Sequence, residues 1–156
     1  MLDDAQAPLQ PQKSKSIGFV PQHIYKMQSD WYHTVRQKFG LPLDSRHLYT
    51  KSDWEVFAAS VASKSVRREL LESIAYWVNE TITDRPLTDL YNTEGDGGFP
   101  GPNFFARPVV GGHFAVLALE RACGGQAMDG LGFLEQDASK EQLFTVFQAV
   151  ETIGKQ

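Results

Sequence analysis

The side chains best suited to chemistry gather in one stretch of the sequence, residues 44–55. Its polar members are Asp44, Ser45, Arg46, His47, Thr50, Lys51, Ser52, Asp53 and Glu55. Paired carboxylates suit acid–base chemistry, so Asp44 and Asp53 are candidate acids or bases. His47 suits either a general base or a structural hydrogen bond. A hydroxyl beside a lysine would supply an activated nucleophile.

Ordinary helix chemistry accounts for several of the same residues. Ser52 and Glu55 fit the S-x-x-E capping box of a helix start. Asp53 in the first helical turn is favoured by the helix macrodipole, and Lys51 suits a solvated face. Neighbouring residues on a helix point in different directions, so the run from Thr50 to Asp53 is not a catalytic triad by itself.

Two further polar clusters follow along the chain. In the first, Asp89 and Tyr91 are candidates to face a pocket, whereas Asp96 beside two glycines is typical of a turn. In the second, Arg107 sits in an apolar stretch and needs a carboxylate or a bound anion as its partner. An internal ion pair explains Arg107 as well as a substrate contact does, and His113 suits a hydrogen-bonded core histidine.

Composition and spacing exclude several classes of site. The chain has 156 residues, a net charge of −4 and one cysteine, Cys123, so no disulfide forms within this sequence and a cysteine-based zinc site is not expected. No H-x-x-x-H, H-E-x-x-H, P-loop or G-x-G-x-x-G pattern occurs, so we predict no metal and no cofactor. There is no basic stripe and no apolar run of about 18 residues, so we expect neither a nucleic-acid partner nor a membrane span.

The start of the chain and one glycosylation sequon give information on whether the protein is secreted. Residues 1–16 are polar and contain Pro8 and Pro11, so we predict a disordered lead-in without a signal peptide. The triplet N-E-T at residues 79–81 is a glycosylation sequon and hints at a secreted parent protein.

Five segments indicate helices, of which the fourth is short and apolar. The predicted helices are residues 21–39, a helix starting at 52, 66–79, 113–122 and 139–153. Residues 81–112 contain four prolines and six glycines, so we predict a long ordered loop, which in a compact domain often carries function. No segment predicts a strand strongly, although residues 104–110 suit a short extended segment. The predicted fold class is all-α.

Several segments resemble the fungal glutaminase A-type family, in the order and at the spacing of its C-terminal region. They are VPQHIYKMQSDWY (20–32), FGLPLDSRHLYTKSDWEVFAASVAS (39–63), WVNET (77–81), LTDLYNT (87–93) and FFARPVVGGHFAVLAL (104–119). The long motifs LDSRHLYTKSDWE and ARPVVGGHFA are specific. The resemblance covers residues 17–119. It implies a six-hairpin (α/α) toroid from extracellular enzymes that hydrolyse L-glutamine to L-glutamate and ammonia.

The same resemblance implies a fragment. A complete toroid has twelve helices and this chain offers about five, so we predict a partial six-hairpin toroid. Residues 17–119 are then its C-terminal segment, and residues 120–156 a divergent tail with a terminal amphipathic helix. By resemblance the full-length parent is extracellular. We expect the isolated chain to be inactive.

The leading hypothesis is a segment of a glutaminase A-type amidohydrolase without a metal or cofactor. Its predicted catalytic residues, acting as acids or bases, are Asp44, Asp53 and Asp89. Its predicted substrate-binding residues are Arg46, His47 and Arg107. Either arginine would clamp the substrate α-carboxylate at two points. We further predict that these six residues lie nearer to one another than chance allows.

Two other hypotheses stay open. A glycosidase-like six-hairpin segment would use paired carboxylates on a sugar, because a fold does not decide function. A non-catalytic helical remnant is the third, and its exposed apolar helix faces would mediate self-association. The small-molecule partner of the parent is accordingly glutamine or a sugar.

Overall fold

The computed structural model of the chain describes residues 19–107 and 109–136. Its main helices and its strands are α1 (Gln22–Val35), β1 (Tyr49–Lys51), α2 (Ser52–Ser60), α3 (Lys64–Glu80), β2 (Leu90–Asn92) and α4 (Ala115–Arg121). Four single-turn helices complete the described part: η1 (Gly111–Phe114), η2 (Ala122–Gly125), α5 (Gln126–Asp129) and η3 (Gly132–Glu135). The described part is mostly helical, which confirms the all-α class. None of its helices has the length and apolar character of a membrane span.

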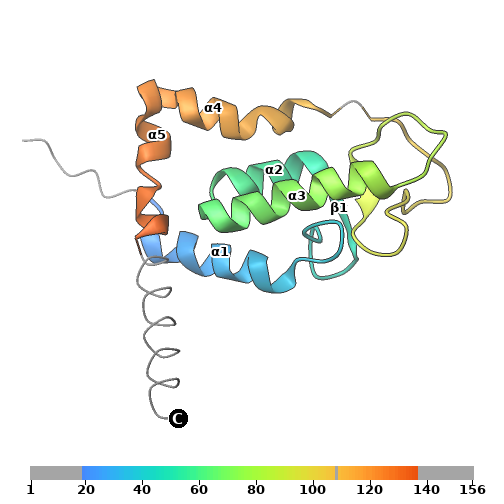
Figure 1. The fold of residues 1–156 in the computed structure, drawn as a ribbon, viewed down its shortest axis with the longest axis horizontal. Helices are drawn as coiled ribbons and strands as arrows, with labels where there is room; N and C mark the ends of the chain where they lie inside the picture. The colour runs from blue at the N-terminus through green and yellow to red at the C-terminus, as the bar shows by residue number, and fades with distance from the viewer. Residues whose placement is uncertain (1–18, 108, 137–156) are drawn as a thin grey trace, which may run out of the picture.

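The helices α2 and α3 form a hairpin at the centre of the molecule. α1 lies along one side of this hairpin and α4 along the other, and the irregular segments gather at one end (Figure 1). Only residues 61–63 join the two helices, which is typical of an antiparallel helical hairpin. A helical hairpin flanked by further helices is the unit expected of a partial six-hairpin domain.

Polar caps fix the α2–α3 hairpin. The Ser63 hydroxyl accepts a hydrogen bond from the Val66 amide at the start of α3, 3.4 Å. The Arg67 guanidinium donates from Nε to the Ala59 carbonyl, 3.0 Å, and from Nη2 to the Ser60 carbonyl, 3.3 Å. Arg67 thereby satisfies carbonyls at the C-terminal end of α2, where a helix leaves them without partners and a positive charge is stabilising.

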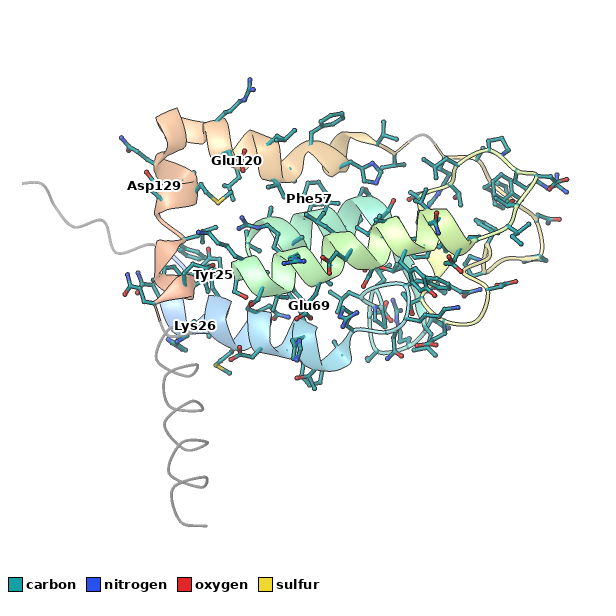
Figure 2. All side chains as sticks on the ribbon, viewed as in Figure 1. Tyr25, Lys26, Phe57, Glu69, Glu120 and Asp129 are labelled. Carbon is teal, nitrogen blue, oxygen red and sulfur yellow. The ribbon has the colours of Figure 1, made fainter. Side chains whose placement is uncertain are left out.

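Polar side chains also join α1 to α3. The Glu69 carboxylate lies between these two helices (Figure 2) and contacts His33 Nδ1 at 2.8 Å and Arg36 Nε at 3.4 Å. Toward the other end, the Ser63 amide donates to the Ser29 hydroxyl, 3.0 Å. These contacts set the position of α1, and so of the connection that follows it.

Two apolar clusters form the interior. The first comprises Leu41, Ala59, Ala62, Val66 and Leu70. The second comprises Phe39, Trp77 and Tyr91, with the Trp77 and Tyr91 rings stacked 3.7 Å apart between centroids. The connection after α1 contributes to both clusters, because Phe39 enters one and Leu41 the other. Packing rather than local helicity therefore holds this connection in place.

The first helix ends at Val35, four residues before the end that the sequence predicted. Arg36 has extended backbone, with φ −60° and ψ 134°. A tight turn follows, in which the Gln37 amide donates to the Gly40 carbonyl, 2.8 Å, and Gly40 has φ +127°. The apolar spacing continued past Val35 because the buried Phe39 belongs to this turn.

A small antiparallel sheet was not predicted. β1 pairs with β2, and Thr50 lies opposite Tyr91. Each strand has three residues, which is too short to show an alternating pattern in the sequence. The strands bring residues about 40 positions apart beside the start of α2.

The long Gly- and Pro-rich loop is confirmed where it is described. In residues 81–107, 109 and 110, β2 is the element with regular hydrogen bonding. The predicted lead-in, residues 1–16, and the predicted terminal helix, residues 139–153, lie outside the described residues.

Candidate functional site

A cavity of about 710 Å³ lies in the described part of the chain. It lies between α1, the connection after it and α2. Its lining residues include Trp31, Tyr32, Asp44, Arg46, His47, Leu48, Trp54, Glu55 and Phe57. Three of the six predicted site residues, Asp44, Arg46 and His47, therefore share one cavity.

Asp44 and Arg46 form a two-point ion pair on this cavity wall. Arg46 Nη2 lies 2.6 Å from Asp44 Oδ2, and Nε lies 3.1 Å from Oδ1. The Arg46 amide also donates to Oδ1, 2.8 Å. The hydrogen bonds from Arg46 lower the pKa of Asp44 to about 2, and the same pair raises the pKa of Arg46. Both groups are thus charged across the physiological range.

Backbone contacts hold the loop that carries this pair. Its start is fixed where the Leu43 amide donates to the Tyr49 carbonyl, 3.0 Å, and its end where the Thr93 amide donates to the Leu48 carbonyl, 2.8 Å. His47 lies inside the loop and stacks on the Tyr49 ring, with centroids 4.9 Å apart and planes 13° apart. The sheet thus positions Asp44, Arg46 and His47 together.

Aromatic side chains form the apolar wall of the cavity. Trp31 of α1 and Trp54 of α2 are each 58% exposed. Trp54 meets Phe57 edge to face, with centroids 6.5 Å apart. Phe57 itself lies between α2 and α4 in projection (Figure 2). An apolar wall with a few charged groups at its rim is the usual composition of a small-molecule site.

Glu55 is the chemically unusual residue of the cavity, and sequence reasoning assigned it to helix capping. Its side chain instead reaches away from the helix start, to the Leu41 amide and the Tyr91 hydroxyl. It is 2% exposed, and burial raises its pKa to about 8. A carboxyl group that stays protonated near neutral pH is able to donate a proton or a hydrogen bond.

The capping interpretation of Ser52 is also wrong. α2 begins without a side-chain cap, and Ser52 Oγ lies 2.9 Å from His113 Nε2. This contact joins the start of α2 to η1, and it satisfies the histidine as predicted for a core residue. Both side chains of the expected capping box instead have tertiary partners: His113 for Ser52, and Leu41 and Tyr91 for Glu55.

Asp89 and Arg107 lie together in a second place. Arg107 donates from Nε to Asp89 Oδ1, 2.8 Å, and from Nη2 to Oδ2, 2.7 Å. The Asp89 side chain is 2% exposed and that of Arg107 37%. Neither residue lines the 710 Å³ cavity. The internal partner that sequence analysis allowed for Arg107 is the one found.

Asp53 is buried at the start of α2, beside η1. The position that a Cβ atom would take at Gly112 is 2.8 Å from Asp53 Cβ, so the two backbones pack closely there. Asp53 Oδ1 has no hydrogen-bond partner among the residues that the structure describes. Asp53, like Asp89, is absent from the wall of the large cavity.

The six predicted residues consequently do not all share the cavity. Asp44, Arg46 and His47 line the cavity, Asp89 pairs with Arg107, and Asp53 packs against Gly112. No hydrogen bond or ion pair links the cavity trio to the other three within residues 19–107 and 109–136. In the same part of the chain, no group of three or more metal-binding side chains gathers.

Comparison with known proteins gives a consistent set of relatives. A family model described as "Glutaminase A six helical-hairpin domain" matches residues 8–117. A protein of Arthroderma benhamiae named "Probable glutaminase" is 69% identical over 134 residues, 86% of this chain and 15% of that protein. "Glutaminase A" of Aspergillus oryzae is 54% identical over 104 residues, 66% of this chain and 15% of that protein. The chain thus spans about 15% of the length of either relative, and no solved structure matches it.

Proposed function

Since this chain belongs to the glutaminase A six-hairpin family, we propose that it is a working part of an amidohydrolase that converts L-glutamine to L-glutamate and ammonia. Both relatives carry glutaminase names, which favours amide hydrolysis over sugar chemistry. The family match covers 110 of the 156 residues, counted from 8 to 117. The part of the enzyme proposed here is a wall of the substrate pocket.

One observation carries this proposal: a fixed pair of opposite charges stands beside a cavity large enough for an amino acid. Glutamine has an α-carboxylate and an α-ammonium group on the same carbon. The Arg46 guanidinium suits the carboxylate, because its two parallel N–H groups match a carboxylate edge. Asp44, which stays ionised, suits the ammonium group. Substrate would take the place of the contact that the two residues now make with each other.

The three predicted acids or bases differ in their position relative to the cavity. Amide hydrolysis needs an attacking group, a proton shuttle and stabilisation of the oxyanion. Asp44 remains a candidate beside the cavity, with His47 as its neighbour. Asp53 and Asp89 stay predictions without a place on this wall, and Asp89 already neutralises Arg107. The groups that attack and stabilise would come from other parts of the parent enzyme.

We also propose an extracellular parent. The family resemblance supports it, and Asn79 of the N-E-T sequon is exposed on the last turn of α3. A glycan attached there would extend into solvent.

A chimaera tests the proposed function. Residues 8–117 of this chain would replace the matching segment of Aspergillus oryzae glutaminase A, and ammonia release from L-glutamine would be measured. We expect the chimaera to be active. Replacing Arg46 by Lys or Asp44 by Asn should lower kcat/KM by roughly 10- to 100-fold, because each change removes a charge-assisted contact of about 1.5–3 kcal/mol.

The matched control is a second arginine–carboxylate pair outside the cavity. Arg68 Nε lies 2.7 Å from Glu72 Oε1 on the exposed face of α3. The Arg68→Lys chimaera should keep the kcat/KM of the parent chimaera. An active chimaera that tolerates both cavity substitutions would show that the pair does not bind substrate, and a folded but inactive chimaera would count against the functional assignment itself.

A further inference from the structure

Glu55 lies where three parts of the fold meet: α2, which carries it, β2, and the connection that follows α1. Its Oε1 accepts a hydrogen bond from the Leu41 amide, and its Oε2 contacts the Tyr91 hydroxyl. Gly40 passes so close that a Cβ atom there would be 2.0 Å from Oε1. One carboxyl group therefore joins elements that are 14 and 36 residues away along the chain.

The hydrogen-bond partners of the Tyr91 hydroxyl indicate whether Glu55 is protonated. The Tyr91 hydroxyl has one proton, and it lies 3.0 Å from the Phe39 carbonyl oxygen as well as against Glu55 Oε2. A carbonyl only accepts, so Tyr91 satisfies Phe39 by donating to it. Tyr91 is then left as an acceptor toward Glu55, and a protonated Glu55 supplies the donor. In this pattern Oε1 accepts from Leu41 while the Oε2 hydroxyl donates to Tyr91.

The surroundings favour the same protonation state. Among the residues that the structure describes, Tyr91 of β2 is the titratable group hydrogen-bonded to Glu55, and burial and the neighbouring carboxyl group raise the pKa of Tyr91. The turn at residues 37–41 presents backbone to Glu55, and the ammonium group of Lys38 is directed to the Gly95 carbonyl, 3.1 Å. No ion pair with Glu55 occurs among the described residues. An unpaired buried carboxylate is costly, so burial raises the pKa of Glu55 to about 8.

We propose that Glu55 is a positioning residue: in its uncharged form it ties Leu41 to α2 and β2, and it thereby holds the loop with Asp44 and Arg46 against the cavity. Leu41 lies three residues before Asp44, and Leu43 is bonded to Tyr49. The loop is thus anchored by Glu55 on one side and by the sheet on the other. This inference rests on the proposed function only for the role of the charged pair.

The sign of the pH dependence follows from the raised pKa. When the connection opens and Glu55 reaches water, its pKa returns to the ordinary value near 4.5. Opening therefore releases a proton at any pH between about 4.5 and 8, and it becomes roughly tenfold more favourable per pH unit in that window. The loop is held most firmly in mild acid, and the dependence levels off above the folded-state pKa.

Hydrogen exchange on the 156-residue chain tests this directly. Protection of residues 37–48 would be measured from pH 5 to 8.5 and corrected for the intrinsic pH dependence of exchange. In the wild type, protection should fall by up to about tenfold per pH unit up to about pH 8. Glu55→Gln should give nearly constant protection, because the amide reproduces one acceptor for Leu41 and one donor for Tyr91. The exposed Glu120→Gln variant should behave as the wild type.

Three results would contradict the proposed role of Glu55. A wild-type slope that persists in Glu55→Gln would show that another group is responsible. A Glu55→Gln chain that loses protection at all pH values, or fails to fold, would show that Glu55 is ionised and accepts from both partners. Peptides from residues 115–121 should not share the slope, since a shared slope would report global unfolding and also overturn the assignment.

The active chimaera gives the functional readout. Glu55→Ala should raise KM for L-glutamine more than it lowers kcat, and Glu55→Gln should restore KM. Suppose that hydrogen exchange gives the expected result but the chimaera tolerates changes at Asp44 and Arg46. The proposed substrate pocket would then be refuted, whereas the proposed role of Glu55 would still hold. The two proposals therefore fail separately.

Discussion

The Arg107 guanidinium donates two hydrogen bonds to the Asp89 carboxylate, 2.8 Å from Nε to Oδ1 and 2.7 Å from Nη2 to Oδ2. Asp89 also accepts a backbone hydrogen bond from the Ser52 amide at its carbonyl, 2.9 Å. Asp89 thus joins Arg107, near the end of the long loop, to Ser52 at the start of α2. Because the Asp89 side chain is only 2% exposed, the pair gives a buried charge its counter-ion.

Removing Arg107 should therefore destabilise the fold. We expect Arg107→Ala to lower the free energy of unfolding by about 3 kcal/mol, since Asp89 would be left buried without a partner. Urea titration followed by circular dichroism measures this change. Arg85→Ala is the control, because its pair with Asp84, 3.2 Å, is exposed and worth less than about 1 kcal/mol. Equal losses in the two variants would show that burial of Asp89 carries no special weight.

The long helices were predictable from sequence, whereas the connections between them were not. The apolar spacing of Leu70, Ile74 and Trp77 predicted α3, because one face of that helix is buried over several turns. The turn at residues 37–40 and the two short strands have no such repeat. Phe39 is buried by tertiary packing across to Tyr91, and a local pattern contains no information on that distant partner.

The site was predictable in part for the same reason. Asp44, Arg46 and His47 stand out because polar residues cluster within a loop, and they do share a cavity. Glu55 was assigned to a cap because its spacing from Ser52 fits one. Its true neighbours come from residues 14 and 36 positions away, so only the fold shows that this carboxyl group is buried. The one available sign of its burial in the sequence was that Glu55 stands beside apolar residues in α2.

Gly40 should be intolerant of a side chain. Its φ of +127° is strained for other residues, and a Cβ atom would overlap the Glu55 carboxyl group at 2.0 Å. Gly95→Ala is the matched control, since Gly95 also has positive φ, +68°, but nothing within 4 Å of its Cβ position. We expect Gly95→Ala to cost about 1 kcal/mol and Gly40→Ala about 2 kcal/mol more. Similar thermal melting temperatures for the two variants would contradict the close packing at Glu55.

The pKa of Asp44 should depend on Arg46. NMR titration of the side-chain carboxyl carbon should give a pKa of about 2 in the wild type, because hydrogen bonds from Arg46 stabilise the ionised form. A pKa lowered on folding means that the stabilising contact is present above the ordinary value and is lost as the pH falls through about 2. In Arg46→Ala the pKa should return toward about 3.9. Arg68→Ala should leave it unchanged, and an unmoved Asp44 in Arg46→Ala would rule out the pair as the cause.

The last expectation concerns catalysis by the chain alone: the purified 156-residue protein should release no measurable ammonia from L-glutamine. It spans about 15% of the length of its glutaminase relatives, and under the proposed function it would supply only one wall of a pocket that the rest of the parent enzyme completes. Catalysis needs groups held in near-attack geometry, and a displacement of about 1 Å costs roughly 100-fold in rate.

An open cavity strengthens that expectation. The side chains of Arg46 and Asp44 are 77% and 31% exposed, so water reaches the charged pair and would weaken its proposed contact with substrate. The assay compares the chain with Aspergillus oryzae glutaminase A under the same conditions, with Asp44→Asn and Asp53→Ala as variants. Turnover that disappears in either variant would prove that these residues complete a site within this segment. Weak binding of glutamine without turnover, lost in Asp44→Asn but kept in Asp53→Ala, is the result that fits a single wall.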